Sequence, residues 1–172
     1  RDVTELSKRE RQLVTKDATI REIHHRVKNN LQTVAALLRM QARRIRSPEA
    51  KAALTEAVSR VAAIAVVHET LSQSYDEVVD FDEVADRVLK MVGSVALTRG
   101  DSVIARREGS FGMVPAEVAT SLSLVITELC QNAMEHGLAN AHRGLVRVLP
   151  LTDGTTLVVE VIDDGKGLPE DF

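Results

Sequence analysis

The chain has 172 residues, a formal net charge of −3 at pH 7, 44% hydrophobic residues and only 2% aromatic residues. Aliphatic side chains must therefore supply the core, and few rings are available to stack on single-stranded nucleic acid. The small net charge gives no reason to expect a polyanionic partner. The single cysteine, Cys130, excludes an internal disulfide and fits a reducing compartment. No apolar run approaches the roughly 18–20 residues of a membrane helix, so we expect a cytoplasmic protein that binds neither membrane nor nucleic acid directly.

The first part of the chain predicts one long helix, because residues 5–46 contain neither glycine nor proline. Apolar residues recur there every seven positions, which is typical of a coiled coil: Leu6, Leu13, Ile20, Val27 and Val34. In the first half of this helix, the second position of each heptad that should face a partner helix is polar, which predicts a weak coiled coil. From Ile23 onward the apolar face widens, which predicts packing against other helices.

A second helix is predicted directly after the first. Ser47 is a favourable N-cap, Pro48 suits the first helical position, and Glu49 suits the positive end of the helix dipole. This helix is expected to run to about Ser74 and to carry an apolar side of its own. Two amphipathic helices joined by a short turn form a hairpin, and one hairpin cannot cover both apolar stripes. We therefore expect two copies to pair as a homodimeric four-helix bundle.

The pattern changes after Tyr75. The expected elements are, in order, a helix over 80–95, a strand over 102–108, a long helix over 115–136, and two strands over 145–151 and 156–162. The last two strands should form a hairpin with Asp153-Gly154 at its tip. Helices gathered on one face of a mixed sheet predict a two-layer α/β sandwich. The expected fold class is therefore α+β, with a helical hairpin followed by this sandwich.

The helix over 115–136 is apolar nearly all round and yet carries a polar stripe. Glu128, Asn132, Glu135 and His136 fall within about one 100° sector of the helix. Polar groups on a largely buried helix are unfavourable unless something satisfies them. A solvated helix edge would explain the same spacing, so the spacing alone leaves both interpretations open.

A second candidate site lies at the end of the last strand, in VIDDGKGLP at 161–169. The strand ends in Asp163, and Gly165 and Gly167 allow the backbone to turn closely against a ligand. A plain Asp-Gly turn is the simpler alternative. An acid–amide stripe followed about thirty residues later by a strand-end Asp-x-Gly-x-Gly is more specific than either feature alone.

This combination resembles the N box and first glycine box of the GHKL ATPases, the fold (also called the Bergerat fold) shared by histidine kinases, gyrase, Hsp90 and MutL. The resemblance implies ATP and Mg²⁺ as cofactors. It implies that Glu128 is a base or water orienter, that Asn132 holds Mg²⁺, and that Asp163 accepts a hydrogen bond from adenine. The nucleotide-binding residues implied in this way are Asn132, Glu135, His136, Asp163, Gly165 and Gly167.

The stretch EIHHRVKNNLQTVAALLRMQ at 22–41 resembles the phosphoacceptor helix of the HisKA_2 class of sensor histidine kinases. The resemblance implies the core of a two-component system, with autophosphorylation on a histidine and transfer to an aspartate of a response-regulator receiver domain. For the cytosolic actinobacterial members of the class, it also implies upstream GAF and PAS domains and a regulator with an RNA-binding ANTAR output. The alternatives are a non-catalytic dimeric adaptor with a degenerate nucleotide domain, and a GHKL ATPase or serine kinase.

The helical wheel separates the two adjacent histidines. The apolar face centres near Val27 and Val34, so His24 should lie at its flank and His25 almost opposite, toward solvent. A phosphoacceptor must be accessible, so we assign His25, with His24 as the alternative. Glu22 is a candidate helper that could orient the ring or accept its proton. Metal binding is disfavoured, because adjacent helical histidines point about 100° apart whereas paired ligands prefer i, i+4 spacing.

Neighbouring residues of the motif leave other roles open. Arg26 follows the acceptor where the commoner HisKA class has an acid, so the group that takes the proton is undecided. Lys28, Asn29 and Asn30 could contact the transferred phosphoryl group or simply solvate the helix, and we expect solvation for Lys28. His68, on the second helix, is expected to pack inside the bundle.

Three segments are expected along the chain. Residues 1–18 would be a coiled-coil linker from an upstream PAS-like domain, since RDVTE resembles a PAS exit motif. Residues 19–76 would form the dimerisation and phosphotransfer domain, and residues 77–172 the GHKL ATP-binding domain. The sequence ends before the lid and second glycine box of that family, so we expect this domain to be C-terminally incomplete and to bind ATP weakly.

Overall fold

The computed structural model describes residues 2–74, 77–98, 102–138 and 143–167, and within these ranges it leaves out the side chains of residues 2–14, 95–98 and 102. The helices are α1 (Asp2–Arg44), α2 (Pro48–Gln73), α3 (Phe81–Thr98) and α4 (Ala116–Asn132), and α4 continues into a π-helical turn over Ala133–Gly137. The strands are β1 (Val78–Asp80), β2 (Ser102–Arg107), β3 (Met113–Pro115), β4 (Arg143–Thr152) and β5 (Leu157–Asp163).

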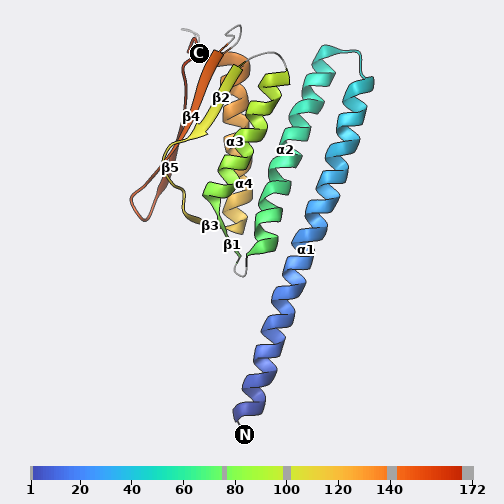
Figure 1. Cartoon of the computed structure of the whole chain (residues 1–172), viewed down its shortest axis with the longest axis vertical. Coiled ribbons are helices and arrows are strands. Elements are labelled where there is room, and N and C mark those ends of the chain that lie inside the picture. The colour runs from blue at the N-terminus through green and yellow to red at the C-terminus, as the bar shows by residue number, and fades with distance from the viewer. Residues whose placement is uncertain (1, 75–76, 99–101, 139–142, 168–172) are drawn as a thin grey trace.

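Helices α1 and α2 form the predicted hairpin. Ser47 caps α2 by accepting a hydrogen bond from the Ala50 amide at 3.3 Å, and Pro48 is the first residue of that helix. Because α1 has 43 residues and α2 has 26, the N-terminal part of α1 extends well beyond the hairpin (Figure 1). The side chains of Leu6 and Leu13, on which the early coil prediction rests, lie outside the described residues.

The main sheet has three strands in the order β2-β4-β5. Strands β2 and β4 run parallel, and β4 and β5 run antiparallel, so the sheet is mixed as predicted. The β4–β5 turn contains Asp153 and Gly154, and Gly154 has a positive φ of 93°. A separate antiparallel ladder joins β1 to β3. The sequence did not predict this ladder, because a three-residue strand is too short to show a period of two.

Helices α3 and α4 lie between the sheet and the hairpin, and α2 lies between this pair and α1 (Figure 1). One continuous core fills the space between these layers. Its members from α2 are Ala63, Val67 and Leu71, and those from the α/β region include Phe81, Val84, Val88, Ile126, Cys130, Val146 and Val148. The hairpin is therefore packed onto the α/β region through buried aliphatic side chains.

Part of the apolar face of α1 is exposed in the single chain. Ala35 and Ala42 are buried against the rest of the hairpin, while Ile23, Val34, Leu37 and Met40 are between 43% and 53% exposed. In the part of the chain that the structure describes, no helix combines the length and the hydrophobicity needed to cross a bilayer.

Candidate functional site

The polar stripe of the 115–136 helix lies on the more open side of α4. Ile126, Thr127 and Cys130 are fully buried, whereas Glu128 is half-buried and Asn132 is exposed. Burial raises the pKa of the Cys130 thiol to about 12, so this thiol stays protonated and is not a nucleophile near neutral pH. Helix α4 ends at Asn132, earlier than the predicted end at residue 136. The turn that follows is π-helical and carries Glu135 and His136, which are both exposed. π-Turns are frequent at functional sites because they re-aim side chains at a helix end.

The loop after β5 packs directly on this π-turn. Asp163 accepts a hydrogen bond from the Gly165 amide at 2.9 Å, and the Lys166 amide donates to the Gly137 carbonyl at 2.9 Å. Asp164 is tied to β4, since its carboxylate accepts from the Leu145 amide at 2.7 Å. The acid–amide helix and the Asp-x-Gly-x-Gly loop, which are separate in the sequence, therefore form one site.

This contact is possible because residues 137 and 165 are glycines and carry no side chain. A Cβ on Gly137 would lie 2.5 Å from the Asp163 Oδ1 atom, and a Cβ on Gly165 would lie 2.2 Å from the Gly137 carbonyl oxygen. Gly167 has a positive φ of 76° and would meet nothing within 4 Å, so it faces open space. The sequence analysis missed Gly137. Its position directly after ELCQNAMEH, as the glycine that ends a helix, was the available signal.

Glu128 is held by a residue of the hairpin. The Arg60 guanidinium of α2 donates from Nε to Glu128 Oε1 at 2.6 Å and from Nη2 to Oε2 at 2.9 Å. Arg60 also pairs with Glu56, one turn earlier on α2. The hydrogen bonds from Arg60 hold the pKa of the Glu128 carboxyl below its usual range. No local pattern pointed to this pair, because the two residues are 68 positions apart.

The two adjacent histidines occupy different environments, as the helical wheel predicted. His25 is exposed and His24 is half-buried. His24 Nδ1 lies 2.9 Å from Nδ1 of His68 on α2, so one ring donates and the other accepts. Burial lowers the pKa of both His24 and His68, and the nearby Glu77 carboxylate partly opposes the shift at His24. His68 is half-buried and contacts α1 within the hairpin, and its predicted place inside a four-helix bundle stays a prediction.

Two other residues of the motif are engaged in ion pairs. Glu22 accepts from Arg26 Nε at 2.7 Å, and this hydrogen bond lowers the pKa of Glu22. The expectation that Lys28 is solvated is wrong: its side chain is only 15% exposed and its Nζ lies 3.7 Å from Glu69. Glu69 also accepts from Arg87 of α3, so one carboxylate joins α1, α2 and α3.

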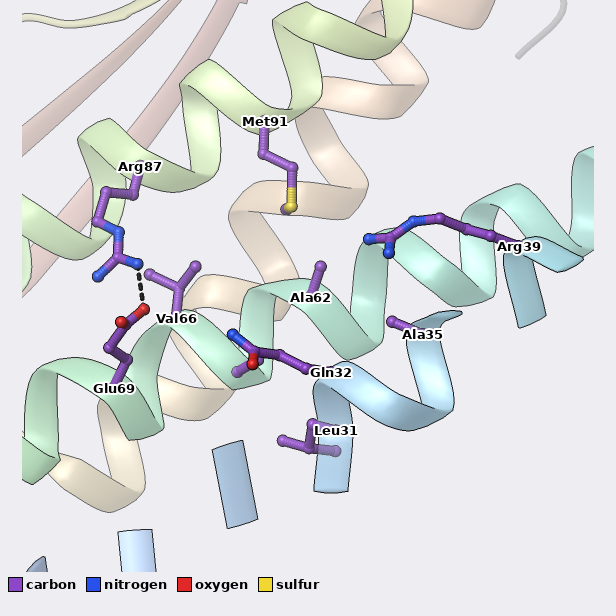
Figure 2. A pocket seen from close by; sticks show the side chains of 10 residues that line it. Leu31, Gln32, Ala35, Arg39, Ala62, Val66, Glu69, Arg87 and Met91 are labelled. Atoms are coloured by element: carbon purple, nitrogen blue, oxygen red, sulfur yellow. Dashed lines mark hydrogen bonds and ion pairs between the residues drawn. The ribbon is translucent and has the colours of Figure 1, made fainter. Parts of the chain in front are cut away.

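A cleft of about 380 Å³ lies between α1, α2 and α3, beside this ion pair (Figure 2). Its floor is aliphatic, and the side chain of Arg39 reaches over it from α1 (Figure 2). The lining residues are Leu31, Gln32, Ala35, Arg39, Ala62, Ala65, Val66, Glu69, Arg87 and Met91. Four of them belong to the 22–41 stretch of α1, but none belongs to the π-turn or to the loop after β5, so this cleft is distinct from the site at the π-turn.

The structure thus brings the π-turn and the Asp163 loop together, whereas Glu128, earlier on α4, is paired with Arg60 of α2. Helix α2 lies between α4, which carries Glu128, and α1, which carries His25 (Figure 1). Among the described residues, no group of three or more His, Cys, Asp or Glu is arranged to hold a metal ion.

Two family matches divide the chain. Residues 22–96 match the HisKA_2 family of histidine kinases, and residues 95–171 match the HATPase_c_2 family, described as a histidine kinase-like ATPase domain. The chain belongs to the histidine kinases. Within that family it is a HisKA_2 core followed by its ATPase domain, which confirms the resemblance of both motif sets.

Characterised relatives agree with this assignment. The chain is 53% identical over 173 residues to the sensor histidine kinases PdtaS of Mycolicibacterium smegmatis and Mycobacterium tuberculosis (strain CDC 1551 / Oshkosh), covering 100% of this chain and 34% of each relative. Blue-light-activated histidine kinase 2 of Erythrobacter litoralis is 24% identical over 161 residues, covering 90% of this chain and 45% of that protein. The chain therefore spans about a third of the length of the first two relatives.

Solved structures share the fold. The histidine kinase domain of the blue-light-activated kinase EL346 from Erythrobacter litoralis matches with a TM-score of 0.58 at 22% identity, covering 93% of this chain and 75% of that domain. A longer EL346 structure matches with a TM-score of 0.59 at 23% identity, covering 90% and 46%. The expected α+β class, a helical hairpin followed by a mixed α/β region, is confirmed at this level.

Gly137→Ala should lower the free energy of unfolding by about 1–3 kcal/mol, because the new methyl group must displace Asp163 or the loop behind it. Gly93→Ala is the matched control: it lies inside α3, and its Cβ would come no closer than 3.8 Å to the Val103 carbonyl. The control should be neutral or stabilising by up to about 1 kcal/mol. Urea denaturation of both variants measures the difference, and equal losses would contradict the proposed contact.

The His24–His68 pair should make stability depend on pH. Above about pH 7 both rings are neutral in the folded and in the unfolded protein. As the pH falls through the ordinary histidine pKa near 6.5, the unfolded chain binds protons at these rings, whereas the folded pair, with its lowered pKa values, binds fewer. Stability is therefore lost toward acid. Denaturation midpoints between about pH 5.5 and 7.5 should fall less steeply in the His24→Asn/His68→Asn variant. His136→Asn, at an exposed position, should keep the original slope, and an unchanged slope in the double variant would refute the coupling.

Proposed function

We propose that this chain is the catalytic core of a sensor histidine kinase that moves the γ-phosphoryl group of ATP to His25 and from there to an aspartate of a response-regulator receiver domain. The observation that carries the proposal is the direct packing of the Asp163 loop on the Gly137 end of α4. This contact joins two nucleotide-binding motifs in a chain that also presents an exposed histidine in a HisKA_2 helix.

The residues at the π-turn suit a Mg²⁺–nucleotide complex of the GHKL type. The exposed amide of Asn132 offers the oxygen ligand that Mg²⁺ prefers, and this ion takes few protein ligands because phosphates and waters supply the rest. Asp163 offers a carboxylate to the adenine amino group, and open space beside Gly167 leaves room for the nucleotide. Glu135 and His136 lie on the same π-turn and are exposed, and we propose that they contact the phosphates. Mg²⁺ would neutralise phosphate charge during transfer.

His25 supplies the nucleophile. A neutral imidazole nitrogen forms the new bond to the γ-phosphorus while the bond to the bridging β-phosphate oxygen breaks and ADP departs. The imidazole proton then passes to a base, for which Glu128 is the candidate and Glu22 a local helper. Both carboxylates are paired with arginines, Arg60 and Arg26 respectively. The subsequent acceptor would be a receiver-domain aspartate, in a regulator that we expect to carry an RNA-binding ANTAR output.

The segments expected from the sequence remain our proposal for the domain organisation: a linker over 1–18, a phosphotransfer domain over 19–76 and an ATP-binding domain over 77–172. We also propose that the hairpin dimerises through α1. Ile23, Val34, Leu37 and Met40 are large apolar side chains exposed along that helix, and burying them against a second copy would complete a four-helix bundle.

Incubation of the full-length protein with γ-labelled ATP and Mg²⁺ should yield acid-labile, base-stable label on histidine. His25→Gln and Asn132→Ala should abolish the label, whereas His24→Gln should retain it. Loss in His24→Gln with retention in His25→Gln would reverse the assignment of the acceptor. Absence of label in the unaltered protein would favour the non-catalytic adaptor, and acid-stable label would point to serine chemistry.

Leu37→Glu should convert a dimer into a monomer, because it places a charge in the proposed α1–α1 interface. Leu151→Glu is the control: Leu151 is 50% exposed, similar to the 53% of Leu37, but lies on the sheet. Light scattering coupled to size exclusion measures the mass of each variant. A dimeric Leu37→Glu protein, or a monomeric control, would contradict dimerisation through this face.

A further inference from the structure

Glu128 and its partner Arg60 join the nucleotide-binding helix to the hairpin at one point. The pair is bidentate, with Arg60 donating to both carboxylate oxygens at 2.6 and 2.9 Å. This geometry is the strongest form of arginine–carboxylate pairing and fixes the direction of the carboxylate. Glu128 is therefore oriented by α2 and not by a residue of its own α/β region.

In this arrangement Glu128 does not face the phosphoacceptor. His68 contacts His24, which marks the level of the acceptor along α2, and Arg60 precedes His68 by eight residues. Eight residues of α-helix span about 12 Å. Moreover, α2 lies between α4 and α1, so Glu128 and His25 are on different sides of it (Figure 1). Proton transfer from His25 to Glu128 requires the carboxylate to leave this position.

We propose that Arg60 is a positioning residue that holds Glu128 on the hairpin in a non-transferring state, and that opening of this ion pair is a required step of autophosphorylation. The inference rests on the proposed kinase function and on Glu128 as its base. It assigns to α2 a restraining role in the reaction, through the side chain of Arg60.

The ion pair is built to open. Arg60 is 50% exposed and Glu128 is 33% exposed, so water can reach both partners when the pair opens. Glu56 competes for the same guanidinium and can keep Arg60 after Glu128 departs. Within the described part of the chain, the charged groups at this position are Arg60 and Glu56, both from α2. Hydrogen bonds from Arg60 lower the pKa of Glu128, which makes the carboxylate a weaker proton acceptor until it is released.

The test is the initial rate of His25 labelling by the full-length protein at a single pH of about 7.5, where a glutamate carboxyl is ionised. Arg60→Gln should label His25 several-fold faster, because Glu128 is no longer held on the hairpin. Arg60→Lys keeps the charge but cannot form two parallel bonds, so its rate should lie in between. Arg106→Gln is the matched control, with an unchanged rate, because Arg106 lies on β2 and pairs with Glu108.

An Arg60→Gln protein that labels His25 at the original rate or more slowly would overturn the restraining role. The titration of the Glu128 carboxyl by NMR needs no turnover and should move to higher pH in Arg60→Gln; an unchanged titration would show that the pair does not form. If no variant labels His25, the kinase proposal fails and the role of Arg60 fails with it. If the unaltered protein labels His25 but Arg60→Gln brings no increase, only the role of Arg60 fails.

Discussion

The burial of α2 on two sides is the constraint on which the rest of the structure depends. One side packs on α1 to make the hairpin, and the other contributes Ala63, Val67 and Leu71 to the core of the α/β region. Val67 and Leu71 are 0% and 3% exposed, and full burial of such side chains contributes about 1.5–3 kcal/mol each. Separating the hairpin from the α/β region would return this surface to water. The position of α4 relative to α1 is therefore set through α2.

Polar side chains of α2 make specific contacts with α1, α3 and α4 in addition to this apolar packing. His68 bonds to His24, which precedes the exposed His25, Glu69 joins Lys28 to Arg87, and Arg60 holds Glu128. The two ion pairs toward α3 and α4 are partly exposed and can exchange partners more easily than the core can open. The buried apolar side chains of α2 hold the elements together, while these polar pairs select one arrangement among those that the apolar packing allows.

The site at the π-turn depends on a different kind of contact, the close approach of two backbone segments. The π-turn at the end of α4 brings Gly137 against Asp163 and Gly165, at distances that leave no space for a Cβ. Hydrogen bonds from the Gly165 and Lys166 amides then fix the loop. As a result, the exposed amide of Asn132, the carboxylate of Asp163 and the glycine backbone of the loop lie at one end of the sheet.

The sequence alone determined the features that depend on neighbouring residues. Ser47 and Pro48 located the start of α2, and Asp153-Gly154 located the β4–β5 turn, because caps and turns are chosen by local hydrogen bonds and local φ preferences. The helical wheel separated exposed His25 from half-buried His24 because a helix has a fixed angular step. The two motif segments that meet at the π-turn were identified in the same way, from residues that stand close together in the chain. Only the tertiary structure decided which distant residues meet: Lys28 with Glu69, Arg60 with Glu128, and Gly137 with Asp163. The two ion pairs have no local signature, since any exposed arginine, lysine or glutamate fits its own helix equally well, and the partner is chosen by how α2 packs between its neighbours. Gly137 meets Asp163 because the loop after β5 packs on the π-turn.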